Sequence, residues 1–395
     1  MALSKRRLGT TSIIIALALV ASAMFFPGSY RAVQGRIEHA FFRTTETQFV
    51  AGTYFHISAT GFRSQAAVDA AFAEINRLNE LWDDALPGSD VNRLEQQAGS
   101  APVRVAPETI ILFKAAKGLS DVTGGAFDIT VGPLVSLWRF DHEEDHSVWE
   151  DHSPPDQNGI ADLLASGVVD YRQVVIDEEA RTVFLTQEGM SLAVGGIAKG
   201  MMVDAAMDIL EEFGVGSAII DAGGDIAILG TKPDAGSWRL GIRHPRNDGI
   251  LGVIESNGVA IATSGDYERH FSHQGQRYHH LLDPVSGQPA AELAQVTIYI
   301  ERETALSFWP EGWPTALADA LATGAFIMGP DGGMELTQSI AGVEAVFVTT
   351  DGAVFLSEGF ENGTVPLTLE DPSAVVGGWL GRDTGDDDNQ EEGGP

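Results

Sequence analysis

The sequence contains no cysteine among its 395 residues. This absence excludes disulfides, thiolate metal sites, a cysteine nucleophile and a lipidated N-terminal cysteine. Hydrophobic residues make up 44% of the chain. A chain of this length and composition can form a sizeable core, so we expect burial of apolar side chains to supply its stability.

Basic residues are also scarce. Lysine and arginine number 24 against 56 acidic residues, the net charge is −32, and only five of the basic residues are lysine. Phosphate contacts need a basic surface, so the composition argues against nucleic acid as a partner. Residues 377–395 carry acidic runs among glycine and asparagine. Such a segment cannot form a core, and we expect it to be a disordered acidic tail.

Only one long hydrophobic run is present. It extends from Ile13 to Phe26 and follows Lys5, Arg6 and Arg7, which is the order typical of a signal peptide. The run is shorter than the ~20 residues that span a bilayer comfortably. Residues 1–35 are therefore predicted to be a signal peptide, with an uncleaved membrane anchor as the alternative. Either way, we expect the folded part in the periplasm or on the outer face of the inner membrane.

The rest of the chain, residues 45–370, shows interleaved strand and helix patterns. Residues 47–60 alternate and predict one β-strand, and the spacing of apolar residues in 64–81 predicts a helix. Further strands are predicted at 173–176, 182–186, 217–221, 225–229, 238–243, 258–263, 296–301, 343–349 and 353–356, and helices at 107–123, 159–166, 198–213 and 317–327. No strict βαβ repeat appears, so the pattern favours an α+β fold with mixed or antiparallel sheets and packed helices.

The segment from Asp141 to Asn158 is rich in aspartate, glutamate, histidine and proline. We expect it to be an exposed loop. Its residues His142, His146 and His152 stand among carboxylates and could hold a metal ion. The alternative is an acidic, solvated insertion, because such spacing without a fixed scaffold is weak evidence for a metal site.

A glycine-rich segment, Gly195 to Gly200, leads into a predicted helix and carries Lys199. Glycines let the backbone approach a ligand closely, and the free N–H groups at the start of a helix attract phosphate. The segment lacks the spacing and the Ser/Thr of a Walker A loop. A helix start of purely structural meaning is the alternative interpretation.

Two polar residues, Asp319 and Thr323, stand four positions apart in a predicted helix and so share one face. A carboxylate and a hydroxyl placed in this way can bind a hard cation such as Mg²⁺, which prefers oxygen ligands. The alternative is structural, with the threonine hydroxyl bonded back to the helix backbone.

Two further groups of residues could have a chemical role. His280 and Asp283 are predicted to lie on a strand that runs into a proline-containing turn, where the histidine could act as a general base. A structural hydrogen bond between the two is the alternative. The segment from Gly124 to Asp128, with Trp138 beyond it, has aromatic side chains that could stack on a flat ring or belong to the core.

In their order along the chain, these segments resemble the ApbE family, the FAD:protein FMN transferases, over about residues 47–350. Nine blocks carry the resemblance: 52–55 (GTYF), 87–90 (PGSD) with 93–94, 125–135 (GAFDITVGPLV), 195–200 (GGIAKG), 223–225 (GGD), 238–242 (WRLGI), 262–266 (ATSGD), 280–284 (HLLDP) with 287 and 289, and 319–323 (DALAT). The resemblance implies a single catalytic unit of the ApbE type, similar to the T-fold.

The resemblance also implies a role for individual residues. Asp319, Thr323 and the main-chain carbonyl near Gly196 would bind Mg²⁺ against the diphosphate of FAD. His280 would deprotonate the threonine of an exported acceptor protein, which receives FMN while AMP leaves. Contacts to FAD are implied for Lys199, Ala126, Phe127, Asp128 and Leu282.

Three implied FAD contacts fall where this chain departs from the family's pattern. Ala51 replaces a common methionine, Ala85 lies where an aromatic residue often precedes the Pro-Asp-Ser turn, and Ala193 replaces an aspartate. We predict that all three positions still adjoin the cofactor. The departures affect the ring contacts of FAD and leave the implied metal ligands unchanged.

Two other functions stay open. The same residues would suit an FAD pyrophosphatase that releases FMN and AMP to water, or a non-enzymatic flavin-binding factor for the maturation of an exported reductase. The segment from Asn257 to Ser264 also resembles a flavin attachment site at Thr263. We interpret this segment as a strand and turn of the family's own fold, because it continues directly into Gly265 and Asp266.

Overall fold

The computed structural model describes residues 42–140, 152–232, 234, 236–301, 304 and 309–371, together with the backbone of 375–378. The predicted signal peptide or anchor (residues 1–35) therefore lies outside the described residues, as do residues 379–395 of the predicted tail. Residues 377 and 378 end a short strand, so the expectation of disorder was wrong for the first two residues of that segment.

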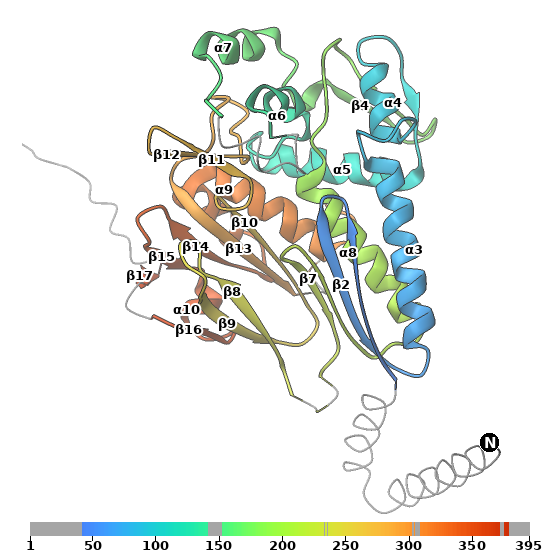
Figure 1. Ribbon diagram of the computed structural model, residues 1–395, viewed down its shortest axis with the longest axis vertical. Helices are drawn as coiled ribbons and strands as arrows, with labels where there is room; N and C mark the ends of the chain where they lie inside the picture. The colour runs from blue at the N-terminus through green and yellow to red at the C-terminus, as the bar shows by residue number, and fades with distance from the viewer. Residues whose placement is uncertain are drawn as a thin grey trace, which may run out of the picture.

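A nine-stranded sheet forms the centre of the fold (Figure 1). Its neighbouring strands are antiparallel except for the last pair. In spatial order the strands are β1 (Arg43–Val50), β2 (Thr53–Thr60), β6 (Ser217–Ala222), β7 (Asp225–Leu229), β10 (Val259–Gly265), β13 (Leu293–Glu301), β14 (Val343–Thr349), β15 (Val354–Leu356) and β17 (Val375–Gly378).

Three small sheets and several helices complete the architecture. The small sheets contain β8 (Trp238–Arg243), β9 (Ile250–Ser256) and β16 (Leu367–Leu369); β3 (Val103–Arg104), β4 (Val174–Asp177) and β5 (Thr182–Leu185); and β11 (His270–His273) with β12 (Gln276–His279). The helices are α3 (Ser64–Trp82), α4 (Asp90–Gln96), α5 (Pro107–Val122), α6 (Gly132–Trp138), α7 (Gln157–Ser166), α8 (Gly195–Glu212), α9 (Pro314–Gln338) and α10 (Glu358–Glu361), with 3-10 turns at Ile129–Val131 and Tyr171–Gln173. The predicted α+β class with antiparallel and mixed sheets is confirmed.

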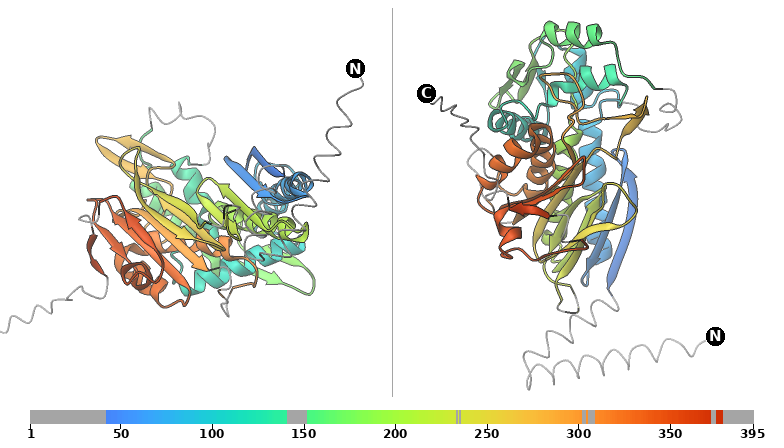
Figure 2. Two further views of the ribbon diagram at one scale, coloured as in Figure 1. Left: turned by 90° about the horizontal axis from the view of Figure 1, so that it is seen from below. Right: turned by 90° about the vertical axis from the view of Figure 1, so that its left-hand side faces the viewer.

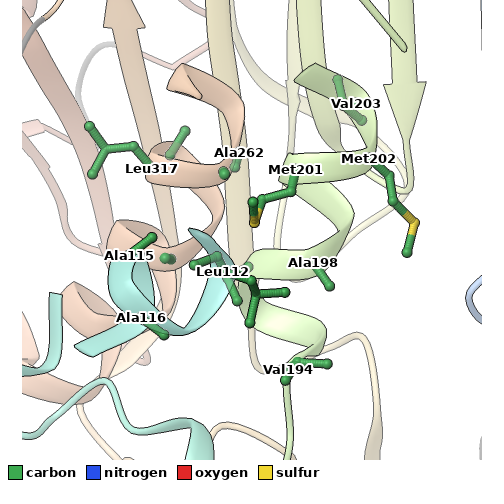
Figure 3. Packing of buried hydrophobic residues seen from close by; sticks show 14 of the residues in the cluster. Leu112, Ala115, Ala116, Val194, Ala198, Met201, Met202, Val203, Ala262 and Leu317 are labelled. Carbon is green, nitrogen blue, oxygen red and sulfur yellow. The ribbon is translucent and has the colours of Figure 1, made fainter. Parts of the chain in front are cut away.

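Helix α8 packs between α3 and α9, and all three helices pack against the large sheet. Their shared core is apolar, and in Figure 3 side chains of α5, α8, α9 and β10 meet at its centre. A second core forms where β8 and β9 cover the sheet over Ile228 and Ile261. Figure 1 shows α4 to α7 and the sheet of β4 gathered beyond one end of the large sheet, and Figure 2 gives two further views.

The first predicted strand was wrong in extent. Residues 47–60 are not one strand but parts of a hairpin, because the chain reverses at Ala51 and Gly52. Both residues have positive φ, 51° and 72°, as a tight two-residue hairpin turn requires. Alternation continues across such a turn, and alanine at the first position is an uncommon choice, so the pattern gave no sign of the reversal.

The long α9 places its first half against α8. Within its bounds, Gly329 has φ 79° and Pro330 follows, so the helix is interrupted there; proline lacks the N–H that a helix interior needs. The predicted helix 317–327 lies wholly in the first half. Among the described residues, no helix is both long and apolar enough to cross a membrane.

Candidate active site

Close packing of α8 against the start of α9 builds the centre of the site. A Cβ on Gly200 would lie 2.5 Å from the Cα of Ala316, so only glycine permits this approach. One turn further along α8, the buried carboxylate of Asp204 accepts hydrogen bonds from the main-chain N–H groups of Thr315 (3.1 Å) and Ala316 (2.9 Å). Asp204 thereby satisfies free donors at the start of α9.

This contact brings Lys199 to Asp319. The Lys199 ammonium donates to both carboxylate oxygens of Asp319, at 3.2 and 3.1 Å, and to the carbonyl of Gly195 at 2.7 Å. Asp319 is 4% exposed and also accepts from the main-chain N–H of Gly200 at 3.3 Å. The lysine of the glycine-rich segment and the predicted metal-binding aspartate are therefore direct partners.

A second buried carboxylate, which the sequence analysis had given no role, completes this cluster. Asp225 is 3% exposed and its Oδ2 lies 3.2 Å from the same ammonium of Lys199. Burial, and then the negative charge of Asp319, raises the pKa of Asp225 well above its ordinary value. Burial alone would lower the pKa of Lys199, but Asp225 and Asp319 outweigh it and raise that pKa. The motif Gly223-Gly224-Asp225 was the signal available in the sequence.

The other predicted metal ligands lie beside this cluster. Thr323 is one turn beyond Asp319 on α9, and its hydroxyl lies 3.2 Å from that of Ser264 on β10. Gly196 faces it, since a Cβ there would lie 3.3 Å from the Thr323 hydroxyl oxygen. Asp319 and Thr323 thus lie on successive turns of α9, with Gly196 of α8 beside Thr323. Their role as metal ligands stays a prediction.

The donors present fit a magnesium ion. Carboxylate, hydroxyl and main-chain carbonyl oxygens are its preferred ligands, and the buried carboxylates of Asp225 and Asp319 share a single ammonium here. Burial and the charge of Asp319 favour the protonated form of Asp225 in the protein alone, and a divalent cation would favour the ionised form instead. Among the described residues, no group of three or more histidine, aspartate or glutamate side chains forms a metal site. A site of mixed oxygen donors does not require such a group.

His280 follows β12 directly. Its main-chain N–H and its Nδ1 both approach the carbonyl of Arg269, at 3.1 and 3.3 Å. A carbonyl can only accept, so Nδ1 carries the proton and the lone pair lies on Nε2. Burial lowers the pKa of His280 well below its ordinary value, and the charges of Arg269 and, to a smaller degree, Lys199 act in the same direction. The ring is therefore neutral at pH 7, as a general base must be.

The alternative of a structural hydrogen bond between His280 and Asp283 was wrong. The Asp283 carboxylate instead accepts from the main-chain N–H groups of Val285 (3.0 Å) and Ser286 (3.2 Å) and from the Ser286 hydroxyl (2.6 Å). Aspartate is well suited to close a turn in this way, so the carboxylate is used locally and His280 is oriented by a main-chain carbonyl. His280 also lies just after the strand that was expected to carry it.

The segment 126–128 lies against Gly196 of α8 and Gly324 of α9. A Cβ added to Gly196 would lie 3.6 Å from the Phe127 ring, and a Cβ added to Gly324 would lie 3.3 Å from the Cβ of Phe127. Asp128 is buried and accepts from Thr130 N–H and hydroxyl, both at 2.7 Å, and from Tyr171 N–H at 2.9 Å. Burial raises the pKa of Asp128 despite these bonds. Its carboxylate therefore organises the protein's own backbone, and Ala126 precedes it half-buried.

Three other residues that were predicted to contact FAD lie in separate parts of the fold. Ala193 N–H donates to the carbonyl of Ile129 at 2.7 Å, which ties the start of α8 to the 126–130 segment. Ala51 lies in the β1–β2 turn, next to Thr53, which packs against Gly223. The Leu282 side chain is buried in a small core with Leu134, Trp138, Phe140, Ile160 and Phe271.

Ala85 lies in the exposed loop between α3 and α4, where its N–H donates to Asp83 at 3.0 Å. Among the described residues, no contact joins Ala85 to the cluster of Lys199, Asp225 and Asp319. Its predicted contact with FAD stays a prediction.

Of the histidine-rich segment from Asp141 to Asn158, the structure describes only the part that begins at His152. His142 and His146 lie outside the described residues. His152 is 7% exposed and packs against Phe271, with ring centroids 5.3 Å apart. The expectation of an exposed loop was therefore wrong at His152, because the aromatic cluster of β11 and β12 covers it.

Two pockets open near these elements. One, of about 300 Å³, lies between β8 and β10 and is lined by residues that include Gly224, Leu240 and Thr263. Thr263 belongs to β10, which is paired on both edges, and its hydroxyl lies 2.9 Å from that of Thr297. The other pocket, of about 610 Å³, adjoins β12.

Comparison with known proteins agrees with this geometry. The model of the ApbE family matches residues 51–347. A Klebsiella pneumoniae protein named FAD:protein FMN transferase is 33% identical over 74% of this chain and 85% of its own length, and one of the same name from Treponema pallidum is 33% identical over 80% and 87%. The crystal structure of a Thermotoga maritima ApbE protein has a TM-score of 0.71 at 30% identity, covering 81% of this chain and 98% of that one. The flavin transferase ApbE from Vibrio cholerae has a TM-score of 0.69 at 26% identity, with coverage of 81% and 98%.

Proposed function

Since the chain belongs to the ApbE family, we propose that it transfers the FMN part of FAD to a threonine hydroxyl of a partner protein and releases AMP. The observation that carries this proposal is the cluster of Lys199, Asp225 and Asp319 at the start of α8, with Thr323 and Gly196 beside it. It combines a helix N-terminus, a charged lysine and hard oxygen donors, which together suit a diphosphate and a divalent cation.

In this proposal, separate groups of the protein bind the diphosphate and accept the proton of the attacking hydroxyl. The first N–H groups of α8 and the Lys199 ammonium bind the diphosphate oxygens, and the apolar pocket between β8 and β10 is the candidate for one ring system of FAD. Nε2 of His280 accepts the proton of the attacking hydroxyl, while the Arg269 carbonyl keeps the ring in the required tautomer. The hydroxyl oxygen forms a bond to the FMN phosphorus, and the bond from that phosphorus to the bridging oxygen breaks as AMP leaves.

Asp319, Thr323 and the main-chain carbonyl near Gly196 would hold Mg²⁺ in this scheme. When bound, the ion offsets negative charge on the diphosphate oxygens. Binding would also favour the ionised form of Asp225, whose pKa is raised in the protein alone by burial and by the charge of Asp319.

The test is incubation of the protein with FAD, Mg²⁺ and a candidate acceptor domain. Covalent flavin fluorescence on the acceptor is expected, and Asp319→Ala should abolish it. Glu335→Ala is the matched control, because it removes one carboxylate from an exposed position on the same helix. AMP formation that does not depend on an acceptor would refute transfer and favour the pyrophosphatase. Binding of FAD without either product would favour a flavin-binding factor.

The proposal includes export. Lys5, Arg6 and Arg7 followed by the apolar run from Ile13 to Phe26 support placement in the periplasm or at the outer face of the inner membrane. Cell fractionation, with N-terminal sequencing of the recovered protein, tests it: cleavage after the apolar run indicates a signal peptide, an intact N-terminus in the membrane fraction indicates an anchor, and recovery from the cytoplasm contradicts export.

A further inference from the structure

An exposed pair of aromatic rings lies at the open end of the β1–β2 hairpin, where the described fold begins. The ring centroids of Phe42 and Phe62 are 5.4 Å apart in an edge-on arrangement. Phe42 is 38% exposed and Phe62 is 82% exposed. Single exposed apolar side chains are common on protein surfaces, but two that touch form a small apolar patch that a partner can cover.

The fold holds this pair in place. The Phe42 carbonyl accepts a hydrogen bond from the main-chain N–H of Gly61 at 3.2 Å and another from the Ser64 hydroxyl at 2.5 Å. These bonds join Phe42 to the end of β2 and to the start of α3. Because the backbone beneath the rings is already ordered, covering them requires little further loss of conformational entropy.

Each of the two phenylalanines is followed by an exposed arginine. Arg43 donates through Nε to the Ser58 hydroxyl at 3.2 Å, and the guanidinium of Arg63 lies 4.6 Å from the centre of the Phe213 ring. Within residues 42–140, 152–232, 236–301 and 309–371, no ion pair involves either arginine. In a chain whose net charge is −32, two positive charges without a carboxylate partner therefore flank the apolar pair.

The chain that precedes the described fold indicates what covers the pair. The apolar run of the predicted signal peptide or anchor ends at Phe26, and the stretch from there to Phe42 is at most about 55 Å long when fully extended. Export delivers this end of the fold to the outer face of the inner membrane, and an anchor would keep lipid at a high local concentration there. A second copy of the chain fits less well, because two rings offer at most about 500 Å² of surface and a stable protein interface buries about 1,000 Å² or more.

We propose that Phe42 and Phe62 insert into the headgroup region at the outer face of the inner membrane. The two arginines that follow them bind lipid phosphates there. This inference rests on the export that the proposed function includes and does not depend on FMN transfer. Phenyl rings gain free energy when they leave water, and arginine side chains reach phosphate oxygens while their apolar stems stay in the interface.

This contact sets the distance between the lipid and the candidate active site. β1 contains eight residues, so it extends about 25 Å from the aromatic pair to the turn at Ala51 and Gly52. Thr53 then packs against Gly223, two residues before Asp225 of the site. Figure 1 shows the turn of this hairpin directed towards the end of the molecule that carries α6 and α7. The acceptor threonine must therefore stand about 25 Å from the lipid surface.

The absence of cysteine allows a fluorophore to be attached at one chosen position. Phe62→Cys is labelled with an environment-sensitive fluorophore, in the protein recovered with whichever N-terminus it has in the cell. The labelled protein is mixed with vesicles of phosphatidylethanolamine and phosphatidylglycerol. Its emission should shift to shorter wavelength, and brominated lipid should quench it. Addition of Phe42→Ser should lower the ratio of inserted to free probe about tenfold, as expected for the loss of one buried phenyl ring.

Tyr54→Cys is the matched control, because Tyr54 is 66% exposed near the turn of the same hairpin. A fluorophore there should keep the emission it has in water and should escape quenching. Phe49→Ser is the control for Phe42→Ser. It removes a ring that is 55% exposed and in contact with Tyr54, and it should leave the signal at position 62 unchanged. The replaced side chains are all exposed, so the variants should fold, which circular dichroism checks.

Three results would overturn the inference: equal quenching at positions 62 and 54, emission at position 62 that vesicles do not change, or short-wavelength emission at position 62 before vesicles are added. The last result would show that another part of this chain or a second copy covers the pair. Failure of the proposed function is a separate outcome, because the vesicle measurement includes neither FMN transfer nor export. Transfer fails if no acceptor is modified, and export fails if the protein is recovered from the cytoplasm.

Discussion

Replacement of Gly200 by alanine tests whether the close contact of α8 and α9 creates the site. The added Cβ would lie 2.5 Å from Ala316 Cα, 2.6 Å from Ala316 N and 2.6 Å from the Thr315 carbonyl oxygen. All three are main-chain atoms, so no side-chain rotation relieves the overlap. The helices must move apart, and Lys199 and Asp319 face each other across this same contact.

The expected magnitude follows from two opposing effects. Alanine in place of glycine stabilises a helix interior by about 1 kcal/mol, whereas overpacking of a tight contact costs about 1–3 kcal/mol. Because the overlap involves backbone, the upper part of that range applies, and the free energy of unfolding should fall by roughly 1–2 kcal/mol. FMN transfer should fall further, by roughly 10²-fold, since a misplacement near 1 Å of groups that position a substrate can have that effect.

Urea unfolding followed by circular dichroism measures the first effect, and flavin fluorescence of the acceptor measures the second. Gly159→Ala is the control, because this glycine lies in α7 with no atom within 4 Å of the added Cβ. It should be neutral or stabilising by about 0.5–1 kcal/mol. A Gly200→Ala protein as stable and as active as the wild type, or an equal loss in Gly159→Ala, would refute the reasoning.

Three further predictions concern single side chains. His280→Gln should lower kcat for transfer by roughly 10²–10⁴-fold, with little change in the dissociation constant of FAD. In the wild type, the transfer rate should not follow a histidine titration between pH 6 and 8, because the lowered pKa leaves His280 neutral there. A wild-type rate that rises through that range would contradict the assignment of His280 as the base. Burial raises the pKa of Asp204 to about 7. The folded state therefore holds a proton on Asp204 that the unfolded state loses above about pH 4. The free energy of unfolding should consequently fall as pH rises from about 4 to 7, by at most about 4 kcal/mol. Asp204→Asn should flatten this slope in urea titrations, and an unchanged slope would show that other groups cause it. Mass spectrometry of the protein after incubation with FAD should find no covalent flavin on Thr263, and a flavin there would reverse our interpretation of that segment.

Local patterns were sufficient where a single element decided the outcome. The spacing of apolar residues predicted α3, the helices predicted at 107–123 and 198–213 correspond to α5 and α8, and the strands predicted at 343–349 and 353–356 correspond to β14 and β15. The i, i+4 placement of Asp319 and Thr323 needed only the helix itself. The order of the blocks indicated the family without knowledge of which residues touch.

Sequence patterns gave a wrong prediction where two different local structures have the same pattern of residues. The Ala51-Gly52 reversal keeps the alternation of one strand, and His280 next to Asp283 has the sequence of a catalytic pair although the aspartate closes its own turn. Neither the competing hydrogen-bond donors nor the turn conformation can be read from spacing. Each was decided by which partner the backbone placed within reach.

The sequence by itself determined the α+β class, the acidic cysteine-free character and the residue types in the segment from Gly195 to Gly200 and at Asp319 and Thr323. Tertiary structure alone decided that Lys199 lies between Asp225 and Asp319, which are separated by 94 residues, and that Arg246 and Arg277 meet on Asp266. The physical reason is that these contacts depend on how closely α8 and α9 approach and on how β11 and β12 fold over the sheet. The charge interactions and burial of these residues depend on distances of a few ångströms in space, which the separation of the residues along the chain does not specify.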